Sequence, residues 1–239
     1  MTDLPHALVI DPRPQCYAET LTTRFADRCR FTFCTVEAEV DAALARADFQ
    51  IVFEVGIADA PRAKLREVYL APSLQWFQVG GSGYEHILPM ERADVQVSNA
   101  AGVLAPFLAE TIMGAMLAIE GQFFRYRDLQ RARVWQPLDF GPLAGRTLLI
   151  VGLGAIGSEL AQRAAAFDMR VLATRRTPAP DPHCAEVHPA DALDALLPEA
   201  DFISLHLRLD AATHHPMNAA RFARMKPGSV MINTARGKV

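Results

Sequence analysis

A short glycine-rich stretch follows the pattern G-x-G-x-x-G, with its glycines at Gly152, Gly154 and Gly157. In such a stretch the first glycine permits a tight turn out of a strand. The second lets the backbone approach a pyrophosphate, and the third lets the next helix pack closely on the strand. The amides of Ala155 and Ile156 then donate to phosphate oxygens, aided by the helix dipole. The alternative is a glycine-rich turn that binds nothing.

The elements on both sides of this stretch match that chemistry. Thr147–Val151 predicts a strand buried on both faces, and Met169–Ala173 predicts a second strand. Between them, apolar residues repeat at helical spacing: Ile156, Leu160, Ala164 and Phe167. The result is one βαβ unit with glycines at its first turn, and this context favours dinucleotide binding.

Strands and helices also alternate through residues 5–98, which predicts a mostly parallel sheet covered on both faces. Apolar runs predict strands at Ala7–Ile10, Arg30–Thr35, Phe49–Phe53, Leu74–Val79 and Val95–Ser98. Helical spacing predicts helices at about Gln15–Arg28, Glu37–Ala47, Pro61–Tyr69 and Tyr84–Arg92.

A second glycine-rich loop follows the fourth of these strands. Ligands of parallel sheets bind outside the carboxyl ends of the strands, so free amides at Gly80 and Gly81 could hold a carboxylate. A flexible turn is the plainer alternative. Trp76 and Phe77, on the strand before the loop, are expected in the core.

The middle of the chain predicts one long apolar helix, from about Pro106 to Leu129, with the proline in its first turn. Its apolar stripe is too wide for a solvated helix, so it must pack on a domain or on a second subunit. Trp135, in the connection that follows, is expected to be a packing residue. The stripe consists of Leu108, Ile112, Ala115, Met116, Ile119 and Phe123.

The last part of the chain continues the alternation. Pro178–Pro189 is predicted to be a proline-rich loop, whose His183 and His188 are expected to be solvated and not bound to a metal. The elements predicted after it are a helix at Asp191–Leu197, a strand at Asp201–His206, a helix at Asn218–Met225 and a strand at Ser229–Asn233.

The overall composition narrows the class of protein. The chain has 239 residues, enough for one large or two modest domains, and 51% of them are hydrophobic. A net charge of −3 gives no reason to expect nucleic acid or an anionic membrane as a partner. The four cysteines show no C-x-x-C spacing, so a reduced, cytoplasmic protein without a metal site is expected.

Five blocks in the same order make the sequence resemble the D-isomer-specific 2-hydroxyacid dehydrogenases over essentially its whole length. The block Asn233-Thr234-Ala235-Arg236-Gly237, preceded by Met225–Gly228, is the most diagnostic. The other matching segments are Gln78–Glu85, Asn99 with Ala109-Glu110, Leu143–Gly157 and Asp201–His206.

The resemblance implies a two-lobed α/β enzyme with its active site between the lobes. Residues 1–98 would be a flavodoxin-like substrate-binding lobe, and residues 99–239 a doubly wound Rossmann cofactor domain. In this family the Gly80-Gly81 amides and Arg236 hold the substrate carboxylate, and Thr234 lies at the cofactor. A guanidinium suits this task because its planar fork can bind a carboxylate and polarise a keto oxygen.

The family's general acid/base histidine and its partner glutamate belong to sequence beyond Val239. On this comparison the Rossmann domain is expected to be incomplete at its C-terminus, with Val230–Ile232 as an apolar edge strand. Either a truncated product is therefore expected, or a protein whose remaining residues are not included in this sequence. The alternative to a working dehydrogenase is a non-catalytic dinucleotide-binding module or a truncated subunit.

Two departures from the family bear on specificity. Arg175 replaces the acidic residue typical of NAD enzymes, with Arg176 beside it and Thr174 and Thr177 flanking the pair. Cationic and hydroxyl groups there suit a 2′-phosphate, so NADP(H) is favoured over NAD(H). The alternative is that these are solvated arginines. Arg208 replaces the usual proline after the third strand, which indicates a differently shaped loop near the nicotinamide.

The resulting expectation is an NAD(P)-dependent oxidoreductase that interconverts a 2-keto acid and a D-2-hydroxy acid. Glyoxylate and hydroxypyruvate are the expected substrates because they are small and common in the family. A homodimer formed through residues 106–129 is the expected assembly.

Overall fold

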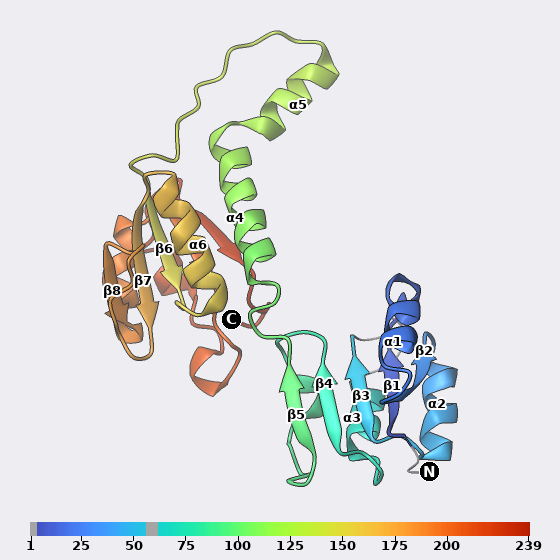
Figure 1. Cartoon of the computed structure of the whole chain (residues 1–239). Helices are drawn as coiled ribbons and strands as arrows, with labels where there is room; N and C mark the ends of the chain where they lie inside the picture. The colour runs from blue at the N-terminus through green and yellow to red at the C-terminus, as the bar shows by residue number, and fades with distance from the viewer. Residues whose placement is uncertain (1–3, 56–61) are drawn as a thin grey trace. The chain divides into compact units, whose positions relative to one another are not determined.

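A five-stranded sheet, parallel throughout, organises the first compact unit, Met1–Ala101. The computed structural model describes residues 4–55 and 62–239. The strand order, β2-β1-β3-β4-β5, is that of flavodoxin-like sheets (Figure 1). The strands are β1 (His6–Ile10), β2 (Arg30–Cys34), β3 (Ile51–Glu54), β4 (Trp76–Val79) and β5 (Gln96–Asn99).

Three α-helices connect these strands: α1 (Ala18–Arg24), α2 (Glu37–Arg46) and α3 (Arg62–Leu70). The predicted start of the third helix at Pro61 lies outside the described residues. Helix α1 is shorter than predicted and follows a 3-10 turn at Pro14–Cys16. The core between helices and sheet is apolar, with Phe49, Tyr69 and Phe77 fully buried.

The helix predicted at Tyr84–Arg92 is wrong, because the structure has only a 3-10 turn there, at Glu85–Ile87. Pro89 has no amide to donate and disfavours helical geometry in the residue before it. The guanidinium of Arg66 on α3 instead donates to the carbonyls of Ile87 and Pro89, at 3.0 and 3.1 Å. These bonds hold the segment on the first unit in a non-helical form.

The second unit, Gly102–Val239, contains another parallel sheet of five strands. Its order, β10-β9-β6-β7-β8, becomes 3-2-1-4-5 when the unit's own strands are numbered along the chain, read from β8. This is the order of a Rossmann sheet, as predicted, and Figure 1 labels three of its neighbouring strands, β6, β7 and β8. The strands are β6 (Thr147–Val151), β7 (Arg170–Arg175), β8 (Glu186–Pro189), β9 (Phe202–Leu205) and β10 (Val230–Asn233).

The long helix predicted at Pro106–Leu129 is wrong as one element. The structure has α4 (Ala105–Glu120) and α5 (Phe123–Ala132), whose axes differ by 56°. Gln122 adopts a left-handed backbone with φ 54°, which ends the first helix. The Phe123 ring closes over Gly121, with a ring carbon 2.6 Å from the position of a Cβ there, so a larger residue would require the ring to move. The sequence did not reveal this break, because apolar residues continue at helical spacing on both sides of it.

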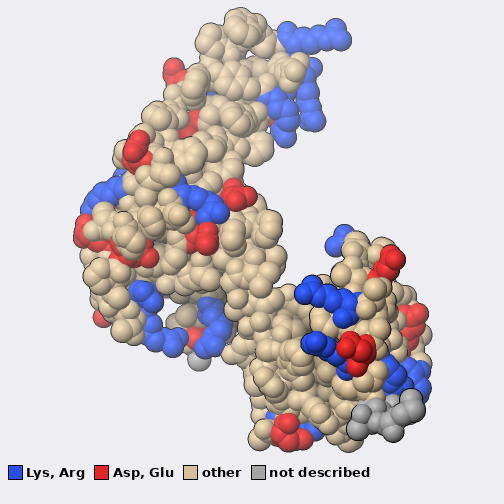
Figure 2. Space-filling model, in the orientation of Figure 1, with Lys and Arg blue, Asp and Glu red and all other residues tan. Residues whose placement is uncertain are grey.

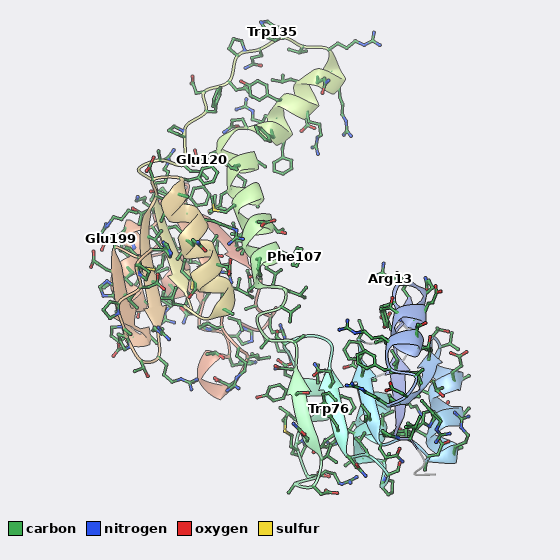
Figure 3. All side chains as sticks on the ribbon, in the orientation of Figure 1. Arg13, Trp76, Phe107, Glu120, Trp135 and Glu199 are labelled. Atoms are coloured by element: carbon green, nitrogen blue, oxygen red, sulfur yellow. The ribbon has the colours of Figure 1, made fainter. Side chains whose placement is uncertain are left out.

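Helix α4 packs on α6 (Ala155–Ala166) through its buried residues Ala105, Ala109, Ile112, Met113 and Met116. The predicted packing of the apolar stripe is therefore found on only one side of α4. Phe107 lies on the side of α4 turned away from α6 and is 65% exposed (Figure 3). Phe123, placed on the stripe by the sequence, is 61% exposed on α5.

The loop predicted at Pro178–Pro189 contains a short strand, β8, which pairs with β7 from Leu172 to Arg175. The pattern of β8, Glu-Val-His-Pro, is too short and polar to reveal a strand without its partner. His188 lies on this strand, with Nε2 3.1 Å from Glu186 Oε2. Two further helices, α7 (Leu193–Leu196) and α8 (Ala219–Phe222), are shorter than predicted.

Three aromatic residues expected to be packed are exposed. Trp76 and Phe77 alternate on β4, so Phe77 enters the core while Trp76 lies on the other face and donates from Nε1 to Ser98 Oγ at 2.7 Å. Phe167 follows the end of α6 and is also exposed. Trp135 is 95% exposed in the loop after α5, so its predicted packing role within the chain is wrong (Figure 3).

Within residues 4–55 and 62–239, no single helix is long and apolar enough to cross a membrane; only α4 and α5 taken together, across their bend, have the length and composition.

Candidate dinucleotide site and substrate loop

The glycine-rich turn after β6 has a backbone that only glycine adopts readily. Gly152 has φ +101°, and a Cβ there would lie 3.1 Å from the carbonyl oxygen of His206. The amides of Gly152 and Leu153 donate to the carbonyl of Thr174 on β7, at 3.1 and 2.9 Å. The turn is thus fixed between the ends of β7 and β9, with β6 between them in the sheet.

The start of α6 is closely packed at one glycine and open at another. A Cβ on Gly157 would lie 2.6 Å from the carbonyl oxygen of Gly152, so the helix can approach β6 only with glycine here. Apart from its chain neighbours and the backbone of α6, no described heavy atom lies within 4 Å of a Cβ built on Gly154. The second glycine therefore borders open space, as a turn that admits a ligand requires.

The first-turn amides of α6 have the geometry of an anion site. The first bond of the helix runs from the Ser158 amide to the Gly154 carbonyl at 2.9 Å, so the amides of Ala155 and Ile156 precede the helical ladder. Gly154, the N-cap, has no side chain to accept from them. These amides and the positive end of the dipole fit a pyrophosphate.

Two further side chains meet at the carboxyl ends of β9 and β10. Thr234 Oγ1 lies 2.9 Å from Nδ1 of His206 and 3.4 Å from the Leu205 carbonyl oxygen. Burial lowers the pKa of His206 to about 4, so its imidazole is neutral at pH 7. Its Nε2 is buried without a hydrogen-bond partner among the described residues, an uncommon state that a ligand could relieve.

Of the two predicted arginines, Arg175 is the last residue of β7 and Arg176 follows it, at the same edge of the sheet, and both are exposed. Nη2 of Arg176 lies 3.7 Å from Oδ2 of Asp210, a residue of the loop after β9. The hydroxyl of Thr174, expected to flank the arginines, belongs to a buried residue of β7 and is not presented beside them. Thr177 is exposed.

Arg236 lies in a turn that Asn233 shapes. The Asn233 side chain accepts from the Ala235 amide and donates to the Arg236 carbonyl, both at 2.9 Å. The Arg236 side chain is exposed, and its Nη1 donates to the Ala235 carbonyl at 2.8 Å. Because β10 pairs with β9, Arg236 and His206 follow neighbouring strand ends.

The loop after β4, in the first unit, differs from expectation at one glycine. The Gly80 amide donates to the Glu54 carbonyl at 2.5 Å, so it is not free to hold a carboxylate. A Cβ on Gly80 would lie 2.6 Å from that oxygen. At Gly81, by contrast, no described heavy atom beyond the chain neighbours lies within 4 Å of a built Cβ, and its carbonyl accepts from the Ala100 amide.

A buried contact between a carboxylate and an imidazole, beside this loop, was missed from the sequence. Oε2 of Glu54, at the end of β3, lies 3.2 Å from Nε2 of His86, and both side chains are largely buried. A charged residue closing the apolar run Ile51–Glu54 was the available signal. Its partner could not be read, because 32 residues separate the two in the chain.

No cluster of three or more His, Cys, Asp or Glu that could hold a metal ion occurs among the described residues. Each of the four cysteines is a free thiol. Burial is the main cause that raises the pKa of Cys34 to about 11 and that of Cys184 to about 12, so these two thiols stay protonated and unreactive at pH 7.

The sheet order and the open helix start define the second unit as a dinucleotide-binding α/β domain. Residues 113–239 match the family model of the D-isomer specific 2-hydroxyacid dehydrogenase, NAD binding domain. The chain therefore belongs to the D-isomer specific 2-hydroxyacid dehydrogenase family.

Individual relatives agree with this membership. The chain is 40% identical over 145 residues to a hydroxypyruvate reductase of Thermotoga maritima, covering 60% of this chain and 46% of the relative. It is 36% identical over 182 residues to a glyoxylate reductase of Thermococcus litoralis, covering 71% and 54%. The chain thus spans about half the length of these two curated relatives.

A solved structure extends the similarity to both units. A D-isomer specific 2-hydroxyacid dehydrogenase family protein from Aeromonas salmonicida subsp. salmonicida superposes with a TM-score of 0.88 at 28% identity. The match covers 99% of this chain and 74% of the other. The expected two-lobed α/β architecture is therefore confirmed.

Proposed function

We propose that the protein transfers a hydride between a nicotinamide dinucleotide and a small 2-keto or D-2-hydroxy acid. One observation carries the proposal: the helix α6 begins at an open glycine, Gly154, at the switch point of a Rossmann sheet. Family membership and relatives named as glyoxylate and hydroxypyruvate reductases support the reaction class.

In this proposal residues 99–239 form the dinucleotide-binding domain, and residues 1–98 the substrate-binding lobe. The amides of Ala155 and Ile156 hold the pyrophosphate, and Gly152, Gly154 and Gly157 give it room. Thr234 contributes through His206, whose ring it orients. The bound dinucleotide supplies or accepts the hydride.

We assign the preference for NADP(H) to Arg175 and Arg176. Both guanidiniums are exposed at the end of β7, where a Rossmann domain places the 2′ position of the adenosine ribose. A phosphate there gains charge-assisted bonds that a ribose hydroxyl cannot offer. Arg175→Asp should reverse the preference in measured NADPH and NADH dissociation constants. An unchanged preference contradicts the assignment.

For the substrate, we assign the carboxylate to the Gly81 amide, since the Gly80 amide is engaged with Glu54. Arg236 is assigned two roles: it binds the acid, and it polarises the keto oxygen of the acid as the hydride arrives. Its exposed guanidinium and the shaped turn before it support this role. Small acids such as glyoxylate and hydroxypyruvate suit both groups.

We infer that the protein forms a homodimer through α4, α5 and the loop that follows. Exposed large hydrophobic residues concentrate on this segment, which also forms an apolar groove. They include Phe107, Leu117, Phe123, Phe124, Trp135 and Phe140. The groove is lined by Phe123, Tyr126, Leu129, Val134, Trp135 and Pro137, together with the polar residues Arg127, Gln130 and Gln136. Exposed apolar patches of this kind commonly mark protein interfaces. The free thiols suit a cytoplasmic protein.

The reaction is tested with the full chain, NADPH and either glyoxylate or hydroxypyruvate, by following the nicotinamide absorbance. The proposal expects turnover that Arg236→Lys lowers about 10²-fold, because the ammonium cannot form the planar fork. Dinucleotide binding without turnover would instead indicate a non-catalytic binding module.

A further inference from the structure

The loop after β9 carries two charged residues, Arg208 and Asp210, toward Arg176, which directly follows β7. Asp210 Oδ2 lies 3.7 Å from Nη2 of Arg176 and 4.0 Å from Nη2 of Arg208. Strands β7 and β9 lie on either side of β6, so this contact spans the end of β6. The loop also reaches the glycine turn, since Leu207 Cδ2 lies 3.1 Å from the position of a Cβ on Gly152. Lys and Arg side chains gather at this end of the unit (Figure 2).

The two carboxylate oxygens of Asp210 have different partners. Oδ1 accepts from the amides of Ala212 and Thr213, at 2.9 and 3.0 Å, and so caps the short turn that follows. Oδ2 faces the two guanidiniums. The hydrogen bond from Thr213 is the main cause that lowers the pKa of Asp210, which is therefore ionised at neutral pH. The turn fixes the carboxylate, and the carboxylate gathers the arginines.

These ion pairs are long and lie in solvent. The side chains of Arg176 and Arg208 are 85% and 61% exposed. Ion pairs of this kind hold their partners weakly, because water and salt screen them. A phosphate monoester carries up to two charges and accepts paired bonds from a guanidinium. It is therefore a stronger partner for these arginines than one carboxylate oxygen.

We infer that Arg208 joins Arg176 in binding the 2′-phosphate of the dinucleotide, and that Asp210 is the internal counter-ion that this phosphate displaces. The inference rests on the proposed NADP(H) function and adds two specificity-determining residues to it. Arg208 strengthens phosphate binding. Asp210 weakens it, because its charge repels the phosphate and competes for both guanidiniums.

The probes are 2′,5′-ADP and 5′-AMP, which differ only in the 2′-phosphate, titrated calorimetrically into the full chain. Arg208→Ala should weaken 2′,5′-ADP binding about tenfold, the equivalent of one charge-assisted bond, and leave the affinity for 5′-AMP unchanged. Asp210→Asn keeps the oxygen that caps the turn and removes the charge, so it should tighten 2′,5′-ADP about threefold. Thermal melts check that each variant is folded.

Arg170→Ala is the matched control. Arg170 begins the strand that Arg175 ends, and it pairs with Glu186 and Glu199 at 2.9 and 2.7 Å, far along β7 from the proposed phosphate. Loss of the Arg170 side chain should change the affinity for neither probe. Inorganic phosphate, titrated separately, should bind at least about tenfold more weakly than 2′,5′-ADP; equal affinities would assign the arginines to free phosphate and overturn the inference.

The outcomes separate this inference from the function on which it rests. If the unmodified protein binds both nucleotides equally, the NADP(H) preference itself is wrong. If it prefers 2′,5′-ADP and Arg208→Ala retains that preference, only the role of Arg208 is wrong. If Asp210→Asn leaves the affinity for 2′,5′-ADP unchanged or weakens it, Asp210 is not the counter-ion.

Discussion

The carbonyl oxygen of Gly152 lies 2.6 Å from the position that a Cβ would take on Gly157. This contact joins the first and third glycines of the turn and sets how closely α6 approaches β6. The second glycine, Gly154, has open space at the same position. The three glycines therefore serve different purposes, two in packing and one toward a ligand.

This difference predicts that one of two similar substitutions lowers stability and the other does not. Gly157→Ala must push a methyl group into backbone, so it should lower the free energy of unfolding by about 2 kcal/mol and the Tm by about 5 to 10 °C. Gly154→Ala should leave the Tm nearly unchanged. Calorimetric melts of both variants check this, and equal Tm values would contradict the packing role of Gly157.

The substrate loop predicts a second pair of this kind. Gly80→Ala should destabilise the first unit by about 2 kcal/mol, because the methyl group would meet the Glu54 carbonyl oxygen. Gly81→Ala should be tolerated in the fold but should raise the KM for glyoxylate, because it places a methyl group beside the proposed carboxylate amide. A Gly81→Ala variant with an unchanged KM would exclude this loop from substrate binding.

His206 predicts a loss of stability in acid. Its pKa is lowered by burial from 6.5 to about 4, so between these values the unfolded chain binds a proton that the folded chain does not. The free energy of unfolding is therefore highest, with respect to His206, above about pH 6.5. It falls as the pH approaches 4, by up to about 3 kcal/mol. Urea midpoints of the unmodified protein and His206→Gln at pH 7 and 4.5 measure this contribution. Identical pH dependence of the two would show that His206 does not carry it.

The exposed apolar residues on α4 predict how the proposed homodimer can be disrupted. Phe107→Glu should convert a dimer to a monomer, because it places a charge in the proposed apolar interface. Val36→Glu is the control, since Val36 is 50% exposed and lies at the start of α2 in the other unit. Light scattering after size exclusion gives both masses. A dimer that survives Phe107→Glu would move the interface elsewhere.

Local sequence patterns predicted those elements whose signals lie within one stretch. Strand β6 has the bounds predicted for it, Thr147–Val151, because its four consecutive apolar residues and the glycines after them are local features. The break at Gly121 was missed since the apolar spacing on both sides is continuous. Strand β8 was missed because its pairing with β7 defines it more than its own residues do.

The candidate site shows the same limit. The glycines, Arg175, Arg176 and Arg236 could be proposed from motifs, because each motif is contiguous. The engagement of the Gly80 amide by Glu54 is a contact across 26 residues and carries no local signal. The approach of Asp210 to Arg176 depends in the same way on the order of three strands.

The central claim is that the turn after β6 binds a nicotinamide dinucleotide through its open glycine. It is tested most directly by calorimetric titration of NADPH and NADH into the unmodified protein, Gly154→Ala and the control Gly81→Ala. The account predicts saturable binding that is tighter for NADPH, unchanged in Gly81→Ala and weakened about tenfold in Gly154→Ala, as expected when a methyl group obstructs the pyrophosphate. Absence of saturable binding, or equal affinities for the unmodified protein and Gly154→Ala, would contradict it.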